Sequence, residues 1–458
     1  MESFDRRLLA PMMVGAVLNP INSSIIAVAL APIGAAFGAP TSQTAWLVSA
    51  LYLATSIGQP LVGRLVDSFG PRRLFLVGAV LTAAAGVLGT LAPNLWVLVG
   101  ARVVLGFGTC AGYPAAMYLI RSESERTGLR SPAGVLTALT VSTQTVAVVG
   151  PTLGGLLIDV GGWRATLAIN VPLGLLSFVL GHRFLPRTAT GARPRIDYPG
   201  ILLFVVGLVS LLLYLMEART SLLWLLAITA VAGAAFVWWE CRRDDPFVDV
   251  RVLVGNAPLV ATYVRSFAAS TVSYAFMYGF TQWMEEGRGL SASVAGLVLL
   301  PTFATGLLVS SLTGRRPEIK RKITVGAITQ VLVCVLLLLL HPHTAIWTLV
   351  AIALLTGIPQ GLVNLGNQNA LYYQADPARM GSSAGLLRTF MYLGAIAAST
   401  GNGIFFGARA TTSGMHHLAI FMLLVAAVFL ALTLADRSLG RVGTVDSAAV
   451  EEAAAVSG

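Results

Sequence analysis

The chain alternates between long apolar runs and short polar connections. About 20 consecutive apolar residues cross the hydrocarbon core of a bilayer as a helix, and backbone polar groups in lipid must be satisfied inside the protein. The runs therefore predict an all-α integral membrane protein. Fourteen helices are expected, over residues 8–31, 44–63, 73–92, 95–120, 132–158, 163–182, 198–217, 222–241, 257–284, 291–313, 322–340, 344–371, 380–406 and 415–435.

The polar connections on the two sides of these helices differ in charge. Counted along the predicted helices, 23 Lys and Arg residues fall on the side of Arg6 and Arg7, and 4 fall on the other side. Cytoplasmic loops carry the excess of Lys and Arg in membrane proteins. The asymmetry predicts a multi-pass protein of a bacterial-type inner (plasma) membrane with both termini in the cytoplasm. A miscount by one helix would destroy the asymmetry, so it also favours fourteen helices.

Composition excludes several classes of function. Of the 458 residues 56% are hydrophobic and 11% are charged, whereas soluble domains carry roughly 25% charged residues. The net charge is +10, but the arginines are scattered singly, which argues against a nucleic-acid partner. The three cysteines lack ligand spacing, the five histidines lie at span ends or in loops, and no nucleotide-binding motif is present. We expect no enzyme activity, no cofactor and no metal site.

The lengths of the connections predict how the helices are grouped. The longest arginine-rich connections frame one pair of helices, which gives a six, two and six arrangement. Two facing six-helix halves suggest a transporter with its solute site at their interface. The predicted parts are an N-terminal bundle (1–184), a linker (185–197), two extra helices (198–241), a second linker (242–256), a C-terminal bundle (257–436) and a disordered cytoplasmic tail (437–458).

The connection between the second and third predicted helices is short and cationic. It reads Gly63-Arg64-Leu65-Val66-Asp67-Ser68-Phe69-Gly70-Pro71-Arg72-Arg73, and it resembles the signature loop G-x-L-x-D-x-x-G-x-R-R of the major facilitator superfamily. The resemblance implies the major facilitator fold and a transport function. The Asp67 carboxylate, at a helix end, can meet a helix N-terminus or an arginine and so latch one of two states. A loop that only sets topology is the alternative. The predicted latch comprises Gly63, Arg64, Asp67, Gly70, Arg72 and Arg73.

Other stretches are similar to the fourteen-helix drug/proton antiporter branch of that superfamily, namely Trp46 with Tyr52, Gly162-Trp163-Arg164 followed by Asn170-Val171-Pro172-Leu173-Gly174, and Asp197-Tyr198-Pro199-Gly200. The run Arg102-Val103-Val104-Leu105-Gly106-Phe107-Gly108 looks like the helix-4 arginine motif of the superfamily, which implies a role for Arg102 in proton relay. The run Gly150-Pro151-Thr152-Leu153-Gly154-Gly155 looks like its antiporter motif, which implies that Gly150, Pro151, Gly154 and Gly155 seal the cavity against leak. Ordinary packing of small residues is the alternative for the second motif.

The first helix departs from that branch. Asn22 stands where the branch usually carries an acid, and asparagine cannot titrate. None of the 20 acids lies near the middle of a predicted span. The proton relay candidates are therefore Arg102, Asp67 and three acids at outward-facing helix ends, Glu217, Glu285 and Glu286. A solvated loop acid with no relay role is the alternative for the last three.

Three arginines fall inside predicted spans, namely Arg102, Arg265 and Arg388. A charge in the membrane is costly unless it faces a cavity or a partner, although Arg265 and Arg388 lie close enough to helix ends to extend to the interface. Three arginines without a central carboxylate suit a neutral or anionic solute better than a lipophilic cation. The predicted cavity residues are Asn22, Arg265, Arg388, Asn364, Gln368, Tyr274 and Tyr278. Contacts between helices are the alternative for the amides, and contact with lipid for the tyrosines.

The sequence thus predicts a secondary active transporter that exports amphiphilic small molecules by alternating access, coupled to protons. Its expected partners are an amphiphilic or anionic solute, protons and membrane lipids, and it is expected to work as a monomer. One alternative is an exporter or lipid translocase for anionic solutes with weak or no proton coupling. A receptor of the same fold that binds without transport is another.

Overall fold

The computed structural model describes residues 4–39, 41–44, 46–128, 133–187, 196–216, 220–243, 246–248, 250–314, 318–407 and 409–440. Glu217, most of the first predicted linker and residues 441–458 lie outside this part of the chain. The described residues contain helices and no strand.

The first half of the chain folds into one helical bundle. Gly70 separates α3 from α4 with a backbone φ of 85°, a left-handed conformation that favours glycine, and Pro71 then opens α4. A second non-helical point, at Gly161 and Gly162, kinks α7 near its end. The helices are α1 (Leu9–Phe37), α2 (Thr41–Thr44), α3 (Trp46–Phe69), α4 (Pro71–Thr90), α5 (Leu95–Thr109), α6 (Gly112–Thr127), α7 (Ala133–Ala168) and α8 (Asn170–Phe184).

The rest of the chain forms a hairpin and a second bundle. The hairpin consists of α9 (Tyr198–Met216) and α10 (Leu223–Glu240). One π-helical turn, Trp283–Gly287, follows the first long helix of the second bundle. The remaining helices are α11 (Val250–Gly255), α12 (Ala257–Gln282), α13 (Ala292–Thr313), α14 (Ile319–Leu338), α15 (Ile346–Gln374), α16 (Met380–Phe406) and α17 (Thr412–Ala435).

Many of these helices are long enough to cross a membrane. Within the described residues nine helices are long and apolar enough to cross a membrane, or ten if the bent pair Thr152–Ala168 and Asn170–Phe184 forms one span. The sequence predicts fourteen membrane-spanning helices, which is more than this number. Helices α3, α12 and α16 do not pass, and each buries polar or charged side chains, such as Gln59, Arg265 and Thr389. Burial of polar groups against other helices lowers hydropathy without preventing a crossing.

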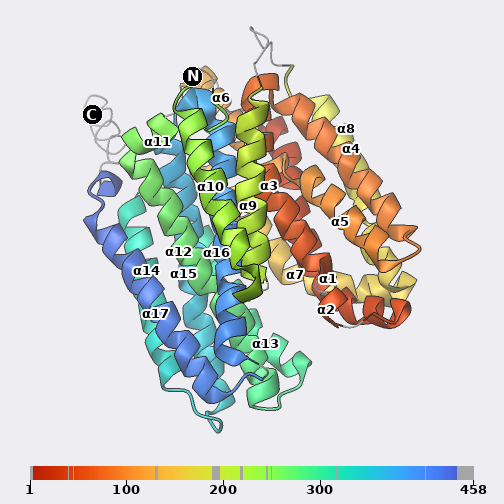
Figure 1. The fold of residues 1–458 in the computed structure, drawn as a ribbon, viewed down its shortest axis with the longest axis vertical. Coiled ribbons are helices and arrows are strands. Elements are labelled where there is room, and N and C mark those ends of the chain that lie inside the picture. The colour runs from red at the N-terminus through yellow and green to blue at the C-terminus, as the bar shows by residue number, and fades with distance from the viewer. Residues whose placement is uncertain are drawn as a thin grey trace, which may run out of the picture.

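The two bundles lie side by side, and the hairpin lies over the line where they meet (Figure 1). Leu208 and Leu212 of α9 are buried in one cluster with Ile57 of α3. The Thr400 hydroxyl of α16 donates to the carbonyl of Leu215 in α9, at 2.7 Å. Helix α9 therefore contacts both halves and covers the seam between α3 and α16.

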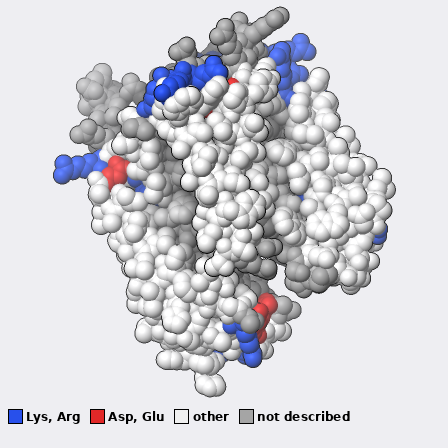
Figure 2. All heavy atoms as spheres, viewed as in Figure 1, with Lys and Arg blue, Asp and Glu red and all other residues white. Residues whose placement is uncertain are grey.

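Lys and Arg side chains gather at one end of the molecule, while most of the surface in view is uncharged (Figure 2). This end carries the first described residues and the ends of α3, α6 and α10, and it is called the basic end below. The uncharged surface beneath it matches a protein whose sides face lipid.

The buried clusters divide along the long axis of the molecule. At the opposite end, one cluster belongs to the first bundle alone and includes Ile33 and Trp163. Another belongs to the second bundle alone and includes Trp283 and Leu340. At the basic end a single cluster joins both bundles. The two halves are thus packed together at the basic end and have separate cores at the other.

Candidate functional site

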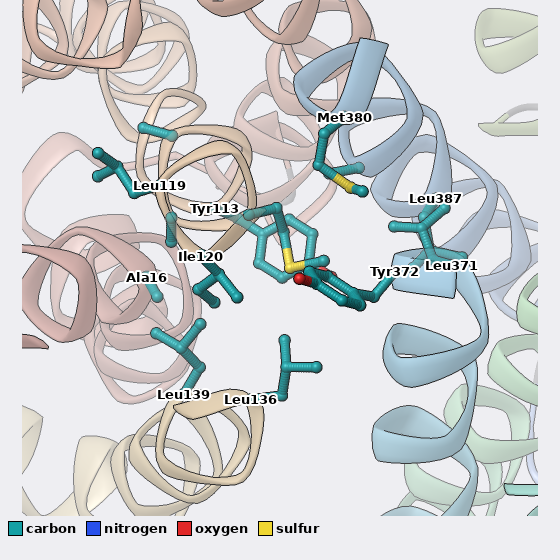
Figure 3. Packing of buried hydrophobic residues seen from close by; sticks show 14 of the residues in the cluster. Ala16, Tyr113, Leu119, Ile120, Leu136, Leu139, Leu371, Tyr372, Met380 and Leu387 are labelled. Carbon is teal, nitrogen blue, oxygen red and sulfur yellow. The ribbon is translucent and has the colours of Figure 1, made fainter. Parts of the chain in front are cut away.

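The shared cluster at the basic end is called the gate cluster here (Figure 3). Helices α1, α3, α4, α6 and α7 supply side chains from the first half, and α12, α15 and α16 supply side chains from the second. These side chains expose at most 7% of their surface, so the two halves are tightly packed against each other here. The residues labelled in Figure 3 are Ala16, Tyr113, Leu119, Ile120, Leu136, Leu139, Leu371, Tyr372, Met380 and Leu387.

Asp67 joins the two halves beside the gate cluster. Its carboxylate accepts hydrogen bonds from the backbone N–H groups of Gly381 and Ser382, each at 2.8 Å, and from the Ser382 hydroxyl at 2.5 Å. These donors lie in the first turn of α16, where the helix dipole favours a negative charge. The predicted meeting of Asp67 with a helix N-terminus is therefore present, and it crosses the interface.

Glycines allow α3 and α16 to approach closely around Asp67. A β-carbon on Gly63 would lie 2.3 Å from the carbonyl oxygen of Gly381. A β-carbon on Gly385 would lie 2.2 Å from the carbonyl oxygen of Gln59. The closed gate therefore depends on glycines from both halves.

The arginines of the predicted latch do not act as one group. The Arg72 side chain donates to the carbonyl of His182 in α8, at 2.6 Å, within the first half. The positive charge of Arg64 acts on the Asp67 carboxylate, and it favours the charged form of that group. Arg73 is exposed. Asp67 and Gly63 contact the second half directly.

A cavity of about 680 Å³ lies between the halves beyond the gate cluster. Of the predicted cavity residues, Arg388, Asn364, Tyr274 and Tyr278 line it. Gln368 lies just behind the wall and donates to Asn364 at 3.2 Å. Gln360, a polar residue of α15 that the sequence also offers as a hydrogen-bonding group for a solute, lines the cavity too. The sequence did not predict several other lining residues, which are Asn19, Tyr52, Gln59, Tyr113, Gln144 and Tyr392.

Polar contacts cross the interface along this cavity. The Tyr392 hydroxyl donates to the Asn19 side chain at 2.8 Å, and the Thr389 hydroxyl donates to the carbonyl of Ser56 at 3.0 Å. The Gln144 amide donates to the carbonyl of Gln360 at 3.2 Å. Sequence patterns cannot identify such pairs, because the partners are far apart in the chain.

Asn22 and Arg102 form a buried network in the first half, away from the cavity lining. The Asn22 side chain is paired with Asn170 through hydrogen bonds of 2.7 and 2.8 Å. The Arg102 guanidinium donates to the carbonyls of Leu47 and Asn22. In the described part of the chain, carbonyls satisfy this buried cation, and no carboxylate is paired with it.

Arg265 also lies outside the cavity lining, contrary to expectation. It is fully buried and pairs with Asp436, just beyond α17, at 2.5 Å, and it donates to the Thr262 hydroxyl at 2.6 Å. Burial raises the pKa of Asp436. Hydrogen bonds from Ser438 and Arg265, together with the charge of Arg265, outweigh this effect, so the pKa of Asp436 lies below its ordinary value. Arg265 is therefore an internal partner of the chain end that follows α17.

We expect Asp436→Asn to lower the free energy of unfolding by about 3 kcal/mol, because it leaves the buried Arg265 unpaired. The lowered pKa means that the ion pair stabilises the fold above about pH 4 and is lost as pH falls through the folded-state pKa. Melting in detergent at pH 7 and at pH 3 checks both effects. The variant should lose part of the acid sensitivity of the wild type. Equal melting temperatures at pH 7 would contradict the assignment.

The antiporter-like motif packs against α1. A β-carbon on Gly150 would lie 2.3 Å from that of Ser24, and one on Gly154 would lie 2.6 Å from a methyl group of Val28. Gly155 has open space around it. The Pro151 side chain lies outside the described residues. Gly150 and Gly154 therefore set the approach of α7 to α1.

We expect Gly154→Leu to inactivate or uncouple transport, because the larger side chain must push α7 from α1. Gly155→Leu is the matched control, since a β-carbon at this next position has no neighbouring atom within 4 Å. Solute flux per folded protein in proteoliposomes separates the two variants. We expect at least a tenfold loss for the first and less than a twofold change for the second. Equal tolerance would indicate simple packing.

Two of the three predicted outward acids, Glu285 and Glu286, fall in the described part of the chain, at the end of α12 and away from the gate cluster. Glu286 accepts hydrogen bonds from the Ala410 N–H at 2.8 Å and from Gln282 at 3.1 Å. It thus ties the end of α12 to the connection before α17. Glu285 lies beside it in the same π-helical turn, and neither lines the cavity.

Two packed helical halves around a central cavity, closed at one end by a shared interface, define the architecture of a membrane transporter. The Major Facilitator Superfamily model matches residues 12–399, and the chain belongs to this family.

Individual relatives agree with this assignment. The chain is 33% identical over 423 residues to the uncharacterized MFS-type transporter YwoD of Bacillus subtilis, over 90% of this chain and 92% of that protein. It is 31% identical over 305 residues to the multidrug resistance protein Stp of Mycobacterium tuberculosis, over 64% of this chain and 55% of Stp. The solved structure of the human organic anion transporter MFSD10 matches with a TM-score of 0.66 at 15% identity, over 93% of this chain and all of that one. This last likeness concerns the fold alone.

Proposed function

We propose that this protein is a secondary active transporter that exports amphiphilic small molecules by alternating access. The observation that carries the proposal is the cavity between two halves that are sealed by the gate cluster at one end and have separate cores at the other. Such an interface can open at one end while it closes at the other. Similarity to a multidrug resistance protein supports export of amphiphiles.

We further propose fourteen crossings in a six, two and six arrangement, with the basic end in the cytoplasm. Five segments join the nine that pass by hydropathy, namely α3, the two parts of the chain on either side of the kink at Gly162, α12 and α16. These segments bury polar residues against other helices, such as Gln59, Asn170 and Thr389, as cavity walls require. In this orientation both termini are cytoplasmic, and the structure represents the state closed to the cytoplasm.

Proton exchange is the proposed driving force. The described cavity lining contains no carboxyl group, so proton binding must act elsewhere. Asp67 is the acid whose protonation would affect closure of the gate, because the charged carboxylate accepts three hydrogen bonds across it. Proton uptake at Asp67 would thus favour opening toward the cytoplasm. We propose that the monomer is the working unit.

Flux in proteoliposomes tests the function. Purified protein should move a fluorescent amphiphile in a saturable manner, faster under an imposed pH gradient than after its collapse by a protonophore. Protein-free vesicles give the background. Binding without flux would indicate a receptor, and flux that ignores the pH gradient would contradict proton coupling while leaving transport intact.

A further inference from the structure

We propose that the transported solute is a monoanionic amphiphile whose acidic group binds Arg388 and whose apolar part packs against the tyrosines of the cavity. The inference rests on the proposed transport function and specifies its substrate class. It starts from the charge of the cavity, because Arg388 is the single charged residue among the described residues that line it.

Arg388 keeps hydrogen-bond donors for a ligand. One of its N–H groups donates to the thioether of Met391 at 3.6 Å, and a thioether is a weak acceptor. The Tyr113 hydroxyl is another neighbour of the guanidinium, and it is uncharged. No acidic residue in the described part of the chain pairs with Arg388. By contrast, Arg265 is paired with Asp436, and Arg102 is bonded to backbone carbonyls. Arg388 is thus the intramembrane arginine whose charge remains uncompensated.

The Tyr113 ring holds the Arg388 guanidinium in place on the side of the gate cluster. The guanidinium lies 3.9 Å from the centre of the Tyr113 ring, in a cation–π contact between the two halves. This contact covers one face of the guanidinium, while the N–H groups at its edge remain able to bind a carboxylate or sulfonate in a fork. Tyr113 belongs to the gate cluster, so an acidic group on Arg388 would lie directly against the closed end of the cavity.

The cavity walls fit an aromatic or aliphatic body beyond that acidic group. Tyr274 and Tyr278 of α12 form one ring pair, and Tyr52 and Tyr392 form another across the interface, each with centroids 5.8 Å apart. All four line the cavity, whose volume of about 680 Å³ suits a drug-sized solute. A cation would meet Arg388 with no lining carboxylate to attract it, and a neutral solute would leave the guanidinium without a strong acceptor.

Binding to the purified protein tests the charge preference without requiring transport. The probes are 1-naphthaleneacetate, 1-naphthaleneacetamide and 2-(1-naphthyl)ethylammonium, which share a ring system and differ in charge. Isothermal titration should show that the acetate binds at least about tenfold more tightly than the other two. Arg388→Gln should abolish that preference while changing amide binding less than about threefold.

Two further variants make the result specific. Arg187→Gln removes an exposed arginine outside the cavity and should bind all three probes as the wild type does. Arg388→Lys keeps the charge but loses the fork, so part of the anion preference should remain, and this variant serves if Arg388→Gln does not fold.

Several results would overturn the anion site. The first is equal binding of the three probes by the wild type, and the second is no binding of any probe. The third is an equal loss of affinity for the acetate and the amide when Arg388 is replaced by glutamine or lysine. Flux of the acetate probe into proteoliposomes separates this inference from the function it rests on. Selective acetate binding without flux keeps the anion site and contradicts transport.

Discussion

Replacing Asp67 with asparagine is expected to leave the protein folded in the membrane and to slow transport by at least tenfold. The carboxylate accepts three hydrogen bonds from the first turn of α16. Asparagine has similar size but no charge, and its NH2 group would face donors. A charge-assisted hydrogen bond contributes about 1.5–3 kcal/mol, so we expect the closed gate to lose about 3 kcal/mol, a factor of roughly 100 in the equilibrium.

Distances across the gate measure this shift directly. Spin labels at Ser122 in α6 and Ala378 just before α16 are exposed and lie on different halves at the basic end. The exposed Cys241 must first be replaced, whereas Cys110 and Cys334 are buried. The Asp67→Asn protein should show longer distances than the wild type.

Glu125→Gln provides the control for Asp67→Asn. It removes an exposed acid of α6 whose partner, Arg121, lies on the same helix. An exposed pair of this kind contributes little, so turnover and distances should match the wild type. Wild-type turnover in the Asp67→Asn protein would contradict a latch at Asp67. Slow turnover with unchanged distances would show that Asp67 acts in a step other than closure of the gate.

Alanine at Gly385 is expected to prevent full closure of the basic end and to abolish most transport. Its β-carbon would lie 2.2 Å from the carbonyl oxygen of Gln59 and 3.0 Å from the α-carbon of Pro60. These are backbone atoms, which cannot rotate away as a side chain does, so α3 and α16 must separate. Overpacking of this kind typically costs about 1–3 kcal/mol, and here it acts on the closed state.

Gly403→Ala in the same helix is the matched control, because a β-carbon there has open space around it. Alanine is a better helix former than glycine by about 1 kcal/mol, so both substitutions should stabilise the helical conformation of α16. We expect longer distances between labels at positions 122 and 378, and little flux, for Gly385→Ala but not for Gly403→Ala. If both variants transport normally, close contact at Gly385 is not needed for the cycle.

The latch and the antiporter-like motif show how far sequence reasoning extends at the site. A carboxylate at a helix end predicts a contact with a helix N-terminus or an arginine. The partner itself, Gly381 and Ser382, is more than three hundred residues away along the chain, and no local pattern selects it. Likewise the run from Gly150 to Gly155 predicts close packing, but only its helical phase in the fold separates Gly154, against α1, from Gly155, in open space.

The sequence by itself determined the membrane class and the helical secondary structure, because lipid allows helices there and hydropathy is a local property. It also carried the resemblance to the major facilitator superfamily, which the family match confirms. Tertiary structure decided which charges face the cavity. Arg265 and Arg388 occupy similar depths in their helices, yet Arg265 meets Asp436 and Arg388 meets open space beside Tyr113. The difference depends on how each helix is rotated against distant neighbours, and packing of the whole bundle sets that rotation.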